Sequence, residues 1–185
     1  MIRSSPKIEG IDLFDGVLLE KIRNESDIAS YGSIRFRPLN SNDYDKGKLI
    51  YLTDNFLQLL SQLTEVGNVD KNQFLSRFHE MKSAGGHYVI VAEEKNTIIA
   101  SATLVTEQKF IHNCALRGHL EDVVVRTEYR DQQIGRLMVS IIKHLAKQLQ
   151  CYKLTLECKD RLISFYEKSG FRKEPGNGNS MNIRF

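Results

Sequence analysis

Two neighbouring stretches of the sequence carry residues that could bind an anionic ligand. Glu121-Asp122-Val123-Val124-Val125 is typical of a strand, and Arg130-Asp131-Gln132-Gln133-Ile134-Gly135-Arg136 follows it and opens a long helix. A tight turn at a helix start directs several backbone N–H groups at one point, and the partial positive charge there favours an anion such as a pyrophosphate. An ordinary strand-to-helix turn with two surface arginines explains the same residues equally well.

Acidic and phenolic side chains are the other candidates for chemistry. Glu121 and Asp122 are adjacent, so on a regular strand they face opposite sides and cannot form a paired dyad. Taken alone, each is better explained as a solvated carboxylate, and so is Glu157. Tyr166 could donate a proton as a general acid, although a tyrosine in a short helix more often packs in a core or an interface.

The strand and turn resemble the acetyl-CoA pyrophosphate loop of the GNAT acetyltransferase superfamily, whose pattern is Arg/Gln-x-x-Gly-x-Gly/Ala. Gln133 stands at the middle glycine of that pattern. The wider sequence is similar to the eukaryotic glucosamine-6-phosphate N-acetyltransferase family, in order from Ile34 to Phe185. The matching pieces are Leu63-Thr64-Glu65-Val66-Gly67, Lys109-Phe110-Ile111-His112, Arg117-Gly118-His119-Leu120-Glu121-Asp122-Val123-Val124-Val125, Cys151-Tyr152-Lys153-Leu154-Thr155-Leu156-Glu157-Cys158, Phe165-Tyr166-Glu167-Lys168-Ser169-Gly170-Phe171 and Ile183-Arg184.

This resemblance implies a GNAT fold, an α/β (α+β) architecture with a mixed central β-sheet flanked by helices, working as an intertwined homodimer with shared active sites. It implies transfer of an acetyl group from acetyl-CoA to the amine of glucosamine 6-phosphate, a step of UDP-N-acetylglucosamine biosynthesis, without a metal. The implied cofactor-binding residues are Val123, Val124, Val125, Arg130, Gln132, Gln133, Ile134, Gly135, Arg136 and Tyr166. The implied substrate-binding residues are Thr64, Lys109, His112, Glu121, Asp122, Glu157 and Arg184.

The catalytic residues that the resemblance implies are Glu121, Glu157 and Tyr166. The amine would attack the thioester directly in a ternary complex, with Tyr166 beside the departing sulfur and Glu121 near the sugar. Strand N–H groups near Val123 would stabilise the oxygen of the tetrahedral intermediate. Glu157 and Arg184 would reach the site from the partner subunit, and Asp122 would be mainly structural.

Two alternatives stay open. A GNAT enzyme acting on a protein or another amine would need an open acidic groove, against which Lys109, His112 and Arg184 argue. The other alternative is a non-catalytic acyl-CoA-binding module, because Gln133 and Leu162 depart from the family pattern. At the position of Leu162 the family commonly has asparagine.

The elements that must position these residues are predicted from hydrophobic periodicity and capping signals. They are a short helix within Leu13–Ile22, a strand over Ser33–Leu39, a helix capped within Asn40–Asp43 and extending to Leu63, a helix from the Asp70/Gln73 capping box to Gly85, a hairpin of Tyr88–Ala92 and Ile98–Val105 around Lys95-Asn96, a strand over Leu120–Val125, a helix over Leu137–Leu149, a strand over Tyr152–Cys158, a helix over Ile163–Ser169 and a strand over Met181–Phe185.

Composition sets the outer limits. The 185 residues, 41% of them hydrophobic, suit one enzyme-sized domain over 33–185 after an N-terminal tail or appended helix over 1–32. The net charge of +3 is spread along the chain, which disfavours a nucleic-acid partner. The three cysteines form no CxxC pair, so no zinc site, disulfide framework or cysteine nucleophile is expected. No long apolar run or secretory signal is present, so we expect a cytoplasmic protein, with peripheral attachment to an intracellular membrane left open.

Overall fold

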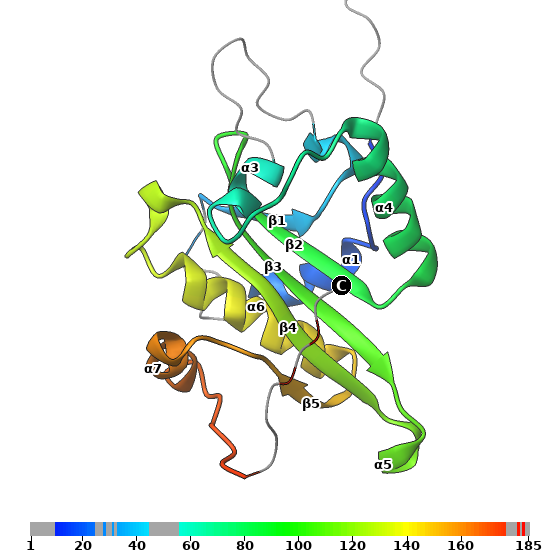
Figure 1. The fold of residues 1–185 in the computed structure, drawn as a ribbon, viewed down its shortest axis with the longest axis vertical. Coiled ribbons are helices and arrows are strands. Elements are labelled where there is room, and N and C mark those ends of the chain that lie inside the picture. Colours follow the sequence, from blue (N-terminus) through cyan, green and yellow to red (C-terminus); the bar gives the residue numbers. More distant parts are fainter. Residues whose placement is uncertain are drawn as a thin grey trace, which may run out of the picture.

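A single mixed β-sheet forms the centre of the molecule (Figure 1). The computed structural model describes residues 10–24, 28, 31, 33–44, 56–176, 181 and 183. Neighbouring strands pair in sequence order, antiparallel from β1 to β4 and parallel between β4 and β5. The strands are β1 Arg35–Pro38, β2 His87–Glu94, β3 Thr97–Gln108, β4 Leu116–Val125 and β5 Cys151–Thr155.

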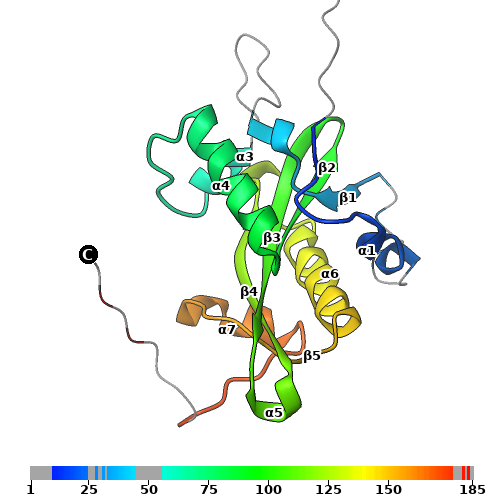
Figure 2. The ribbon, with the colours of Figure 1, turned by 90° about the vertical axis from the view of Figure 1, so that its right-hand side faces the viewer.

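Helices cover both faces of this sheet (Figure 2). On one face, α1 and α6 pack against the sheet, and on the other face α3 and α4 do so. The α-helices are α1 Val17–Glu20, α3 Phe56–Ser61, α4 Lys71–Ala84, α5 Ile111–Cys114, α6 Ile134–Gln148 and α7 Ile163–Glu167. The short 3₁₀ segments are η1 Ile22–Asn24, η2 Ser41–Tyr44, η3 Thr127–Tyr129 and η4 Asp160–Leu162.

The local signals in the sequence explain the best-defined elements. Asp70 accepts a hydrogen bond from the backbone of Gln73, and the side chain of Gln73 reaches back to Asp70, so the predicted capping box opens α4. Lys95 and Asn96 both take positive φ angles, as a tight hairpin turn between β2 and β3 requires. Helix α6 buries one face against the sheet because its apolar residues recur at helical spacing.

Two predicted elements differ from the structure in form or in end point, and a third lies mostly outside the described residues. Residues 41–44 form a 3₁₀ turn in place of the start of a regular helix, and positions 45–55, which include Leu49 and Leu52 of the predicted pattern, lie outside the described residues. Strand β5 ends at Thr155 instead of Cys158. Most of the predicted strand over 181–185 also lies outside the described residues.

The N-terminal segment packs on this sheet. Leu13, Leu19 and Ile22 are buried in the two hydrophobic clusters, although only short helical turns form where the sequence predicts a helix. The domain limits 1–32 and 33–185 stay a prediction. No helix of the described residues is both long and apolar enough to cross a membrane.

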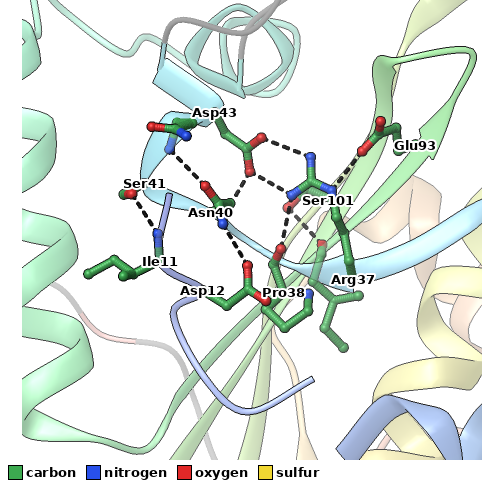
Figure 3. A network of polar contacts seen from close by, with 11 residues as sticks. Ile11, Asp12, Arg37, Pro38, Asn40, Ser41, Asp43, Glu93 and Ser101 are labelled. Atoms are coloured by element: carbon green, nitrogen blue, oxygen red, sulfur yellow. Dashed lines mark hydrogen bonds and ion pairs between the residues drawn. The ribbon is translucent and has the colours of Figure 1, made fainter. Parts of the chain in front are cut away.

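A buried ion cluster ties β1, β2 and η2 together (Figure 3). Arg37 forms two hydrogen bonds of 2.8 Å with the carboxylate of Asp43 and one of 2.6 Å with Glu93. Asp43 also accepts from the backbone N–H of Asn40, whose side chain donates to Asp12. The two carboxylates compensate the burial of Arg37, so the pKa of its guanidinium is raised despite desolvation.

Candidate active site

The sheet opens where the predicted site residues lie. The parallel ladder between β4 and β5 ends at the pair His119 and Thr155, whereas β4 continues to Val125. Among the strands that the structure describes, none pairs with residues 121–125 on the β5 side. Backbone groups on that side of β4 are therefore available to a ligand that lies between the two strands.

A β-bulge interrupts β4 within this open part. Thr103 of β3 pairs with Glu121 but Ser101 pairs with Val124, so β4 contains one more residue than β3 in this interval. Leu120 and Val123 pack in the same hydrophobic cluster although they are three residues apart, which regular alternation forbids. The two residues of the bulge are Asp122 and Val123, while Glu121 keeps its pairing with Thr103 just before it. The expectation that Glu121 and Asp122 face opposite sides of the sheet stays a prediction.

One carboxylate lies in the bulge and the other just before it. Asp122 has a φ of 51°, a left-handed conformation that aspartate tolerates better than most residues. Partial desolvation raises the pKa of its carboxyl group. Both side chains are exposed, Glu121 with 49% of its side chain. Two exposed carboxylates therefore stand where the part of β4 that β5 leaves unpaired begins.

The predicted turn after β4 forms the N-terminus of α6. Gln133 caps this helix with φ 60° and ψ 9°, the left-handed conformation that glycine adopts most easily. Its side chain makes no capping hydrogen bond, so the first N–H groups of the 15-residue helix point outward without a side-chain partner from the cap. Arg130, Gln132 and Arg136 are exposed around them, and Arg130 also donates to the carbonyl oxygen of Val125 at 3.3 Å.

Gly135 brings this helix end close to α7 and to the end of β4. A Cβ atom at Gly135 would lie 3.4 Å from the ring of Phe165 and 3.6 Å from Val125. Ile134, beside it, is buried in the core cluster. The turn at the start of α6, the open end of β4 and the helix that carries Tyr166 therefore converge in one region.

Tyr166 lies half-buried in this region. Its ring packs edge-on against Phe165 and Phe171, with ring centroids 4.9 Å and 5.9 Å away. Burial, and to a lesser degree the nearby Cys158, raise the pKa of its hydroxyl group. The phenol therefore stays protonated through neutral pH, as a proton donor requires.

Hydrogen bonds join the loop after α3 to the segment just before the same turn. The side-chain oxygen of Gln62 accepts hydrogen bonds from the backbone N–H of Thr127 at 2.8 Å and from its hydroxyl at 3.0 Å. Thr64, two residues further on, is exposed. Gln62 and Thr127 were not predicted as site residues, because neither belongs to a recognisable motif.

A polar stripe on β4 was also missed by the sequence analysis. Arg117, His119 and Glu121 alternate along one face of the strand, and Thr155 of β5 lies beside them. Thr155 is 2.9 Å from both Arg117 and His119, and His119 lies 3.6 Å from Glu121. The period-two spacing was the available signal, but only the pairing of β4 with β5 adds Thr155.

The structure does not bring Lys109 and His112 to this region within one chain. They lie at the tip of the β3–β4 hairpin, and β4 spans ten residues, or about 30 Å, between that tip and Val125 (Figure 1). Lys109 forms an ion pair of 2.5 Å with Glu107, and His112 stacks on Tyr152 with ring centroids 4.5 Å apart. The hydrogen bond with Lys109, and then the charges of Lys109 and Arg117, lower the pKa of the Glu107 carboxyl group.

The remaining predicted residues lie near the open edge or outside the described part. Glu157 is exposed two residues beyond the end of β5. Leu162 ends η4 and precedes α7, where it occupies the N-cap position without a side-chain hydrogen bond. Arg184 lies outside the described residues, although its neighbour Ile183 is described and 79% exposed.

Comparison with known proteins gives consistent matches. The model of the Acetyltransferase (GNAT) family matches residues 53–171. A Drosophila melanogaster protein named "Probable glucosamine 6-phosphate N-acetyltransferase" is 54% identical over 154 residues, which are 82% of this chain and 67% of that protein. The Dictyostelium discoideum glucosamine 6-phosphate N-acetyltransferase 1 is 37% identical over 76% of this chain and 86% of its own length.

A solved structure shares the arrangement described above. The crystal structure of glucosamine-6-phosphate N-acetyltransferase from Arabidopsis thaliana superimposes with a TM-score of 0.73 at 35% sequence identity. The match covers 82% of this chain and 98% of that one. The comparison therefore confirms the predicted GNAT fold, a mixed central sheet flanked by helices.

Proposed function

The chain belongs to the GNAT acetyltransferase family, and we propose that it transfers the acetyl group of acetyl-CoA to the amine of glucosamine 6-phosphate. The observation that carries the proposal is the convergence at Gly135 of the open end of β4, the N-terminus of α6 and the helix that bears Tyr166. Relatives that share 54% and 37% of their aligned residues with this chain are named for this reaction, which supports the choice of acceptor.

The open edge of β4 suits the linear part of acetyl-CoA. Its pantetheine arm would form hydrogen bonds with backbone groups of Val123 to Val125. Its pyrophosphate would accept hydrogen bonds from the backbone N–H groups of Ile134 and Gly135. Arg130 and Arg136 stand beside that helix end and add positive charge, while Gln132 and Gln133 offer amide donors. The thioester would then lie near the bulge, where the amine is expected.

The reaction proceeds by direct attack in a ternary complex. The amine nitrogen forms a bond to the thioester carbonyl carbon, and the C–S bond breaks when the tetrahedral intermediate collapses. Tyr166 gives its proton to the departing sulfur and is reprotonated from solvent, and Glu121, the carboxylate just before the bulge, takes a proton from the amine. Holding both substrates in register lowers the barrier, by up to about 7–11 kcal/mol in favourable systems.

We further propose that a second copy of the chain completes the sugar-phosphate site. Lys109 and His112 lie at the far end of β4 from the turn, so they serve such a site most readily in a partner subunit. Phe110 and Ile111 beside them expose 96% and 62% of their surfaces, and such apolar side chains are normally covered at an interface. In this proposal Glu157 and Arg184 also act across the dimer.

Release of the coenzyme A thiol with matched sugars tests the proposed function. With acetyl-CoA present, we expect glucosamine 6-phosphate to be acetylated at least tenfold more efficiently in kcat/KM than glucosamine, because the phosphate gains charge-assisted hydrogen bonds that the free sugar lacks. N-terminal peptides and lysine peptides serve as control acceptors. Equal kcat/KM for the two sugars, or faster acetylation of a peptide, would contradict the proposal.

A further inference from the structure

We propose that His119 is a positioning residue that relays the amine proton from Glu121 to solvent. The proposal rests on the proposed function, since it takes Glu121 as the carboxylate nearest the sugar amine. The observation behind it is a chain of side chains that runs Glu121, His119, Thr155 and Arg117 along the junction of β4 and β5.

Strand register places these groups together. Arg117, His119 and Glu121 are alternate residues of β4, so their side chains share one face before the bulge begins. His119 pairs with Thr155 in the last position of the parallel ladder. The imidazole therefore lies where β4 and β5 separate, between the paired region and the open region that takes the substrates.

The hydroxyl of Thr155 can hold His119 in the tautomer that the relay needs. Arg117 can only donate, and its guanidinium nitrogens lie 2.9 Å and 3.3 Å from Thr155 Oγ1. The carbonyl oxygen of Gly118, 3.5 Å away, is an acceptor for the hydroxyl hydrogen, so Thr155 Oγ1 is able to accept from His119. The relay takes the proton of neutral His119 to be on Nδ1, which then donates to Thr155 Oγ1 across 2.9 Å. This leaves Nε2 as the basic nitrogen.

That basic nitrogen lies near the carboxylate of Glu121. His119 Nε2 lies 3.6 Å from Glu121 Oε1, a separation that a small side-chain rotation turns into a hydrogen bond. The charged groups that act on the ring are Glu121 and Arg117 on β4 and Glu107 on β3, while β5 contributes the neutral hydroxyl of Thr155. The ring thus stands between a carboxylate that can give it a proton and a hydroxyl that contacts its other nitrogen, as a proton carrier requires.

The proton balance of the reaction gives this carrier a task. A substrate ammonium loses two protons on its way to the amide, while the departing thiolate takes up one, so one proton per turnover must leave the site. In the proposed relay, Glu121 accepts it from the amine and passes it to His119 Nε2. The ring exposes 22% of its side-chain surface, so it can then release the proton to water or buffer.

Two replacements of His119 distinguish proton transfer from a purely structural role. His119→Gln keeps an amide group near the Nε2 position but cannot carry a proton, and His119→Ala leaves room for a small base. With glucosamine 6-phosphate and acetyl-CoA we expect both variants to lose about 10²-fold in kcat, the lower end of the usual range for acid–base groups. Free imidazole should restore the activity of His119→Ala in a concentration-dependent way. The acidic limb of the pH profile of kcat/KM should also change in both variants.

Controls and alternatives have distinct readouts. His79→Ala removes an exposed histidine of α4 and should match the wild type with and without imidazole. Thr155→Val removes the hydroxyl that contacts Nδ1 of His119, so the imidazole is no longer held in one tautomer. We expect this variant to lower kcat by a few fold, while acetyl-CoA affinity and the melting temperature stay near wild type. If His119→Ala does not fold, the kcat of Thr155→Val still tests the relay.

A wild-type kcat in His119→Gln, or a loss without imidazole rescue and with an unchanged pH profile, would overturn the relay. An inactive wild type would instead count against the proposed function.

Discussion

Tyr166 is the residue whose surroundings most directly imply a chemical role. Its pKa is raised by burial and by Cys158, so its hydroxyl group keeps its proton through neutral pH and loses it only as the pH rises through that elevated value. We expect Tyr166→Phe to lower kcat by about 10²-fold at neutral pH, because general acids contribute roughly 10²–10⁴-fold. Acetyl-CoA affinity should change little, since leaving-group assistance acts mainly in the transition state.

The measurement is kcat as a function of pH for both proteins, with acetyl-CoA affinity from calorimetry. The ratio of wild-type to Tyr166→Phe kcat should hold at neutral pH and fall toward one in alkaline solution, where the wild-type phenol ionises. Unchanged kcat in the variant, under conditions where chemistry limits the rate, would remove Tyr166 from the mechanism.

Single residues also show where sequence reasoning succeeded. Gln133 departs from the glycine of the GNAT loop pattern, and the structure nevertheless gives it the left-handed backbone that glycine favours. Asp70 and Gln73 form the predicted capping box, because both partners lie within one helical turn. Signals of this kind are local, so a few neighbouring residues are enough to form the structure that they predict.

At the scale of elements, the limits of sequence reasoning follow from non-local pairing. The bulge at Asp122 and Val123 depends on how β4 pairs with β3, so alternation along one strand could not locate it. The same holds for the stripe of Arg117 and His119, which gains its meaning from Thr155 on another strand. The end of β5 at Thr155 was likewise set by the separation of two strands and not by a local breaker.

The contact between α6 and α7 gives a matched pair of variants. A Cβ at Gly135 would lie 3.4 Å from Phe165, an ordinary van der Waals distance, so Gly135→Ala should fold and stay within about 1 kcal/mol of wild type in unfolding free energy. Gly135→Val adds two methyl groups between α6, Phe165 and Val125, and should cost about 1–3 kcal/mol. Its acetyl-CoA affinity should fall as well, because the helix end shifts.

Urea unfolding and acetyl-CoA titration of the two variants check this expectation. The alanine variant is the control for loss of glycine itself, so only the difference between the two reports on the helix contact. Equal stability and equal affinity for both would show that α6 and α7 are not held as closely as the structure indicates.

At the scale of the whole molecule, the described chain leaves apolar and cationic groups far from the rest of the candidate site. Phe110 and Ile111 project from the hairpin tip, and Met181 and Ile183 of the C-terminal segment are 91% and 79% exposed. Local sequence patterns could not place Lys109 and His112 relative to the turn, since the length of β4 separates them. A second subunit would cover the apolar groups and give the cations a sugar phosphate to bind, as the family resemblance implies.

Subunit mixing tests this shared-site arrangement. In the proposed dimer, Tyr166 acts in its own subunit's site and Arg184 acts in the site of the partner. Mixed dimers of Arg184→Ala and Tyr166→Phe subunits would therefore contain one site with both changes and one site with neither. With free exchange of equal amounts, half of the dimers are mixed and activity should rise to about a quarter of wild type, above either variant alone. Two differently tagged subunits, purified through both tags, provide the heterodimers for the assay. Heterodimers that stay as inactive as their parents, or a monomer with full activity, would contradict the shared site.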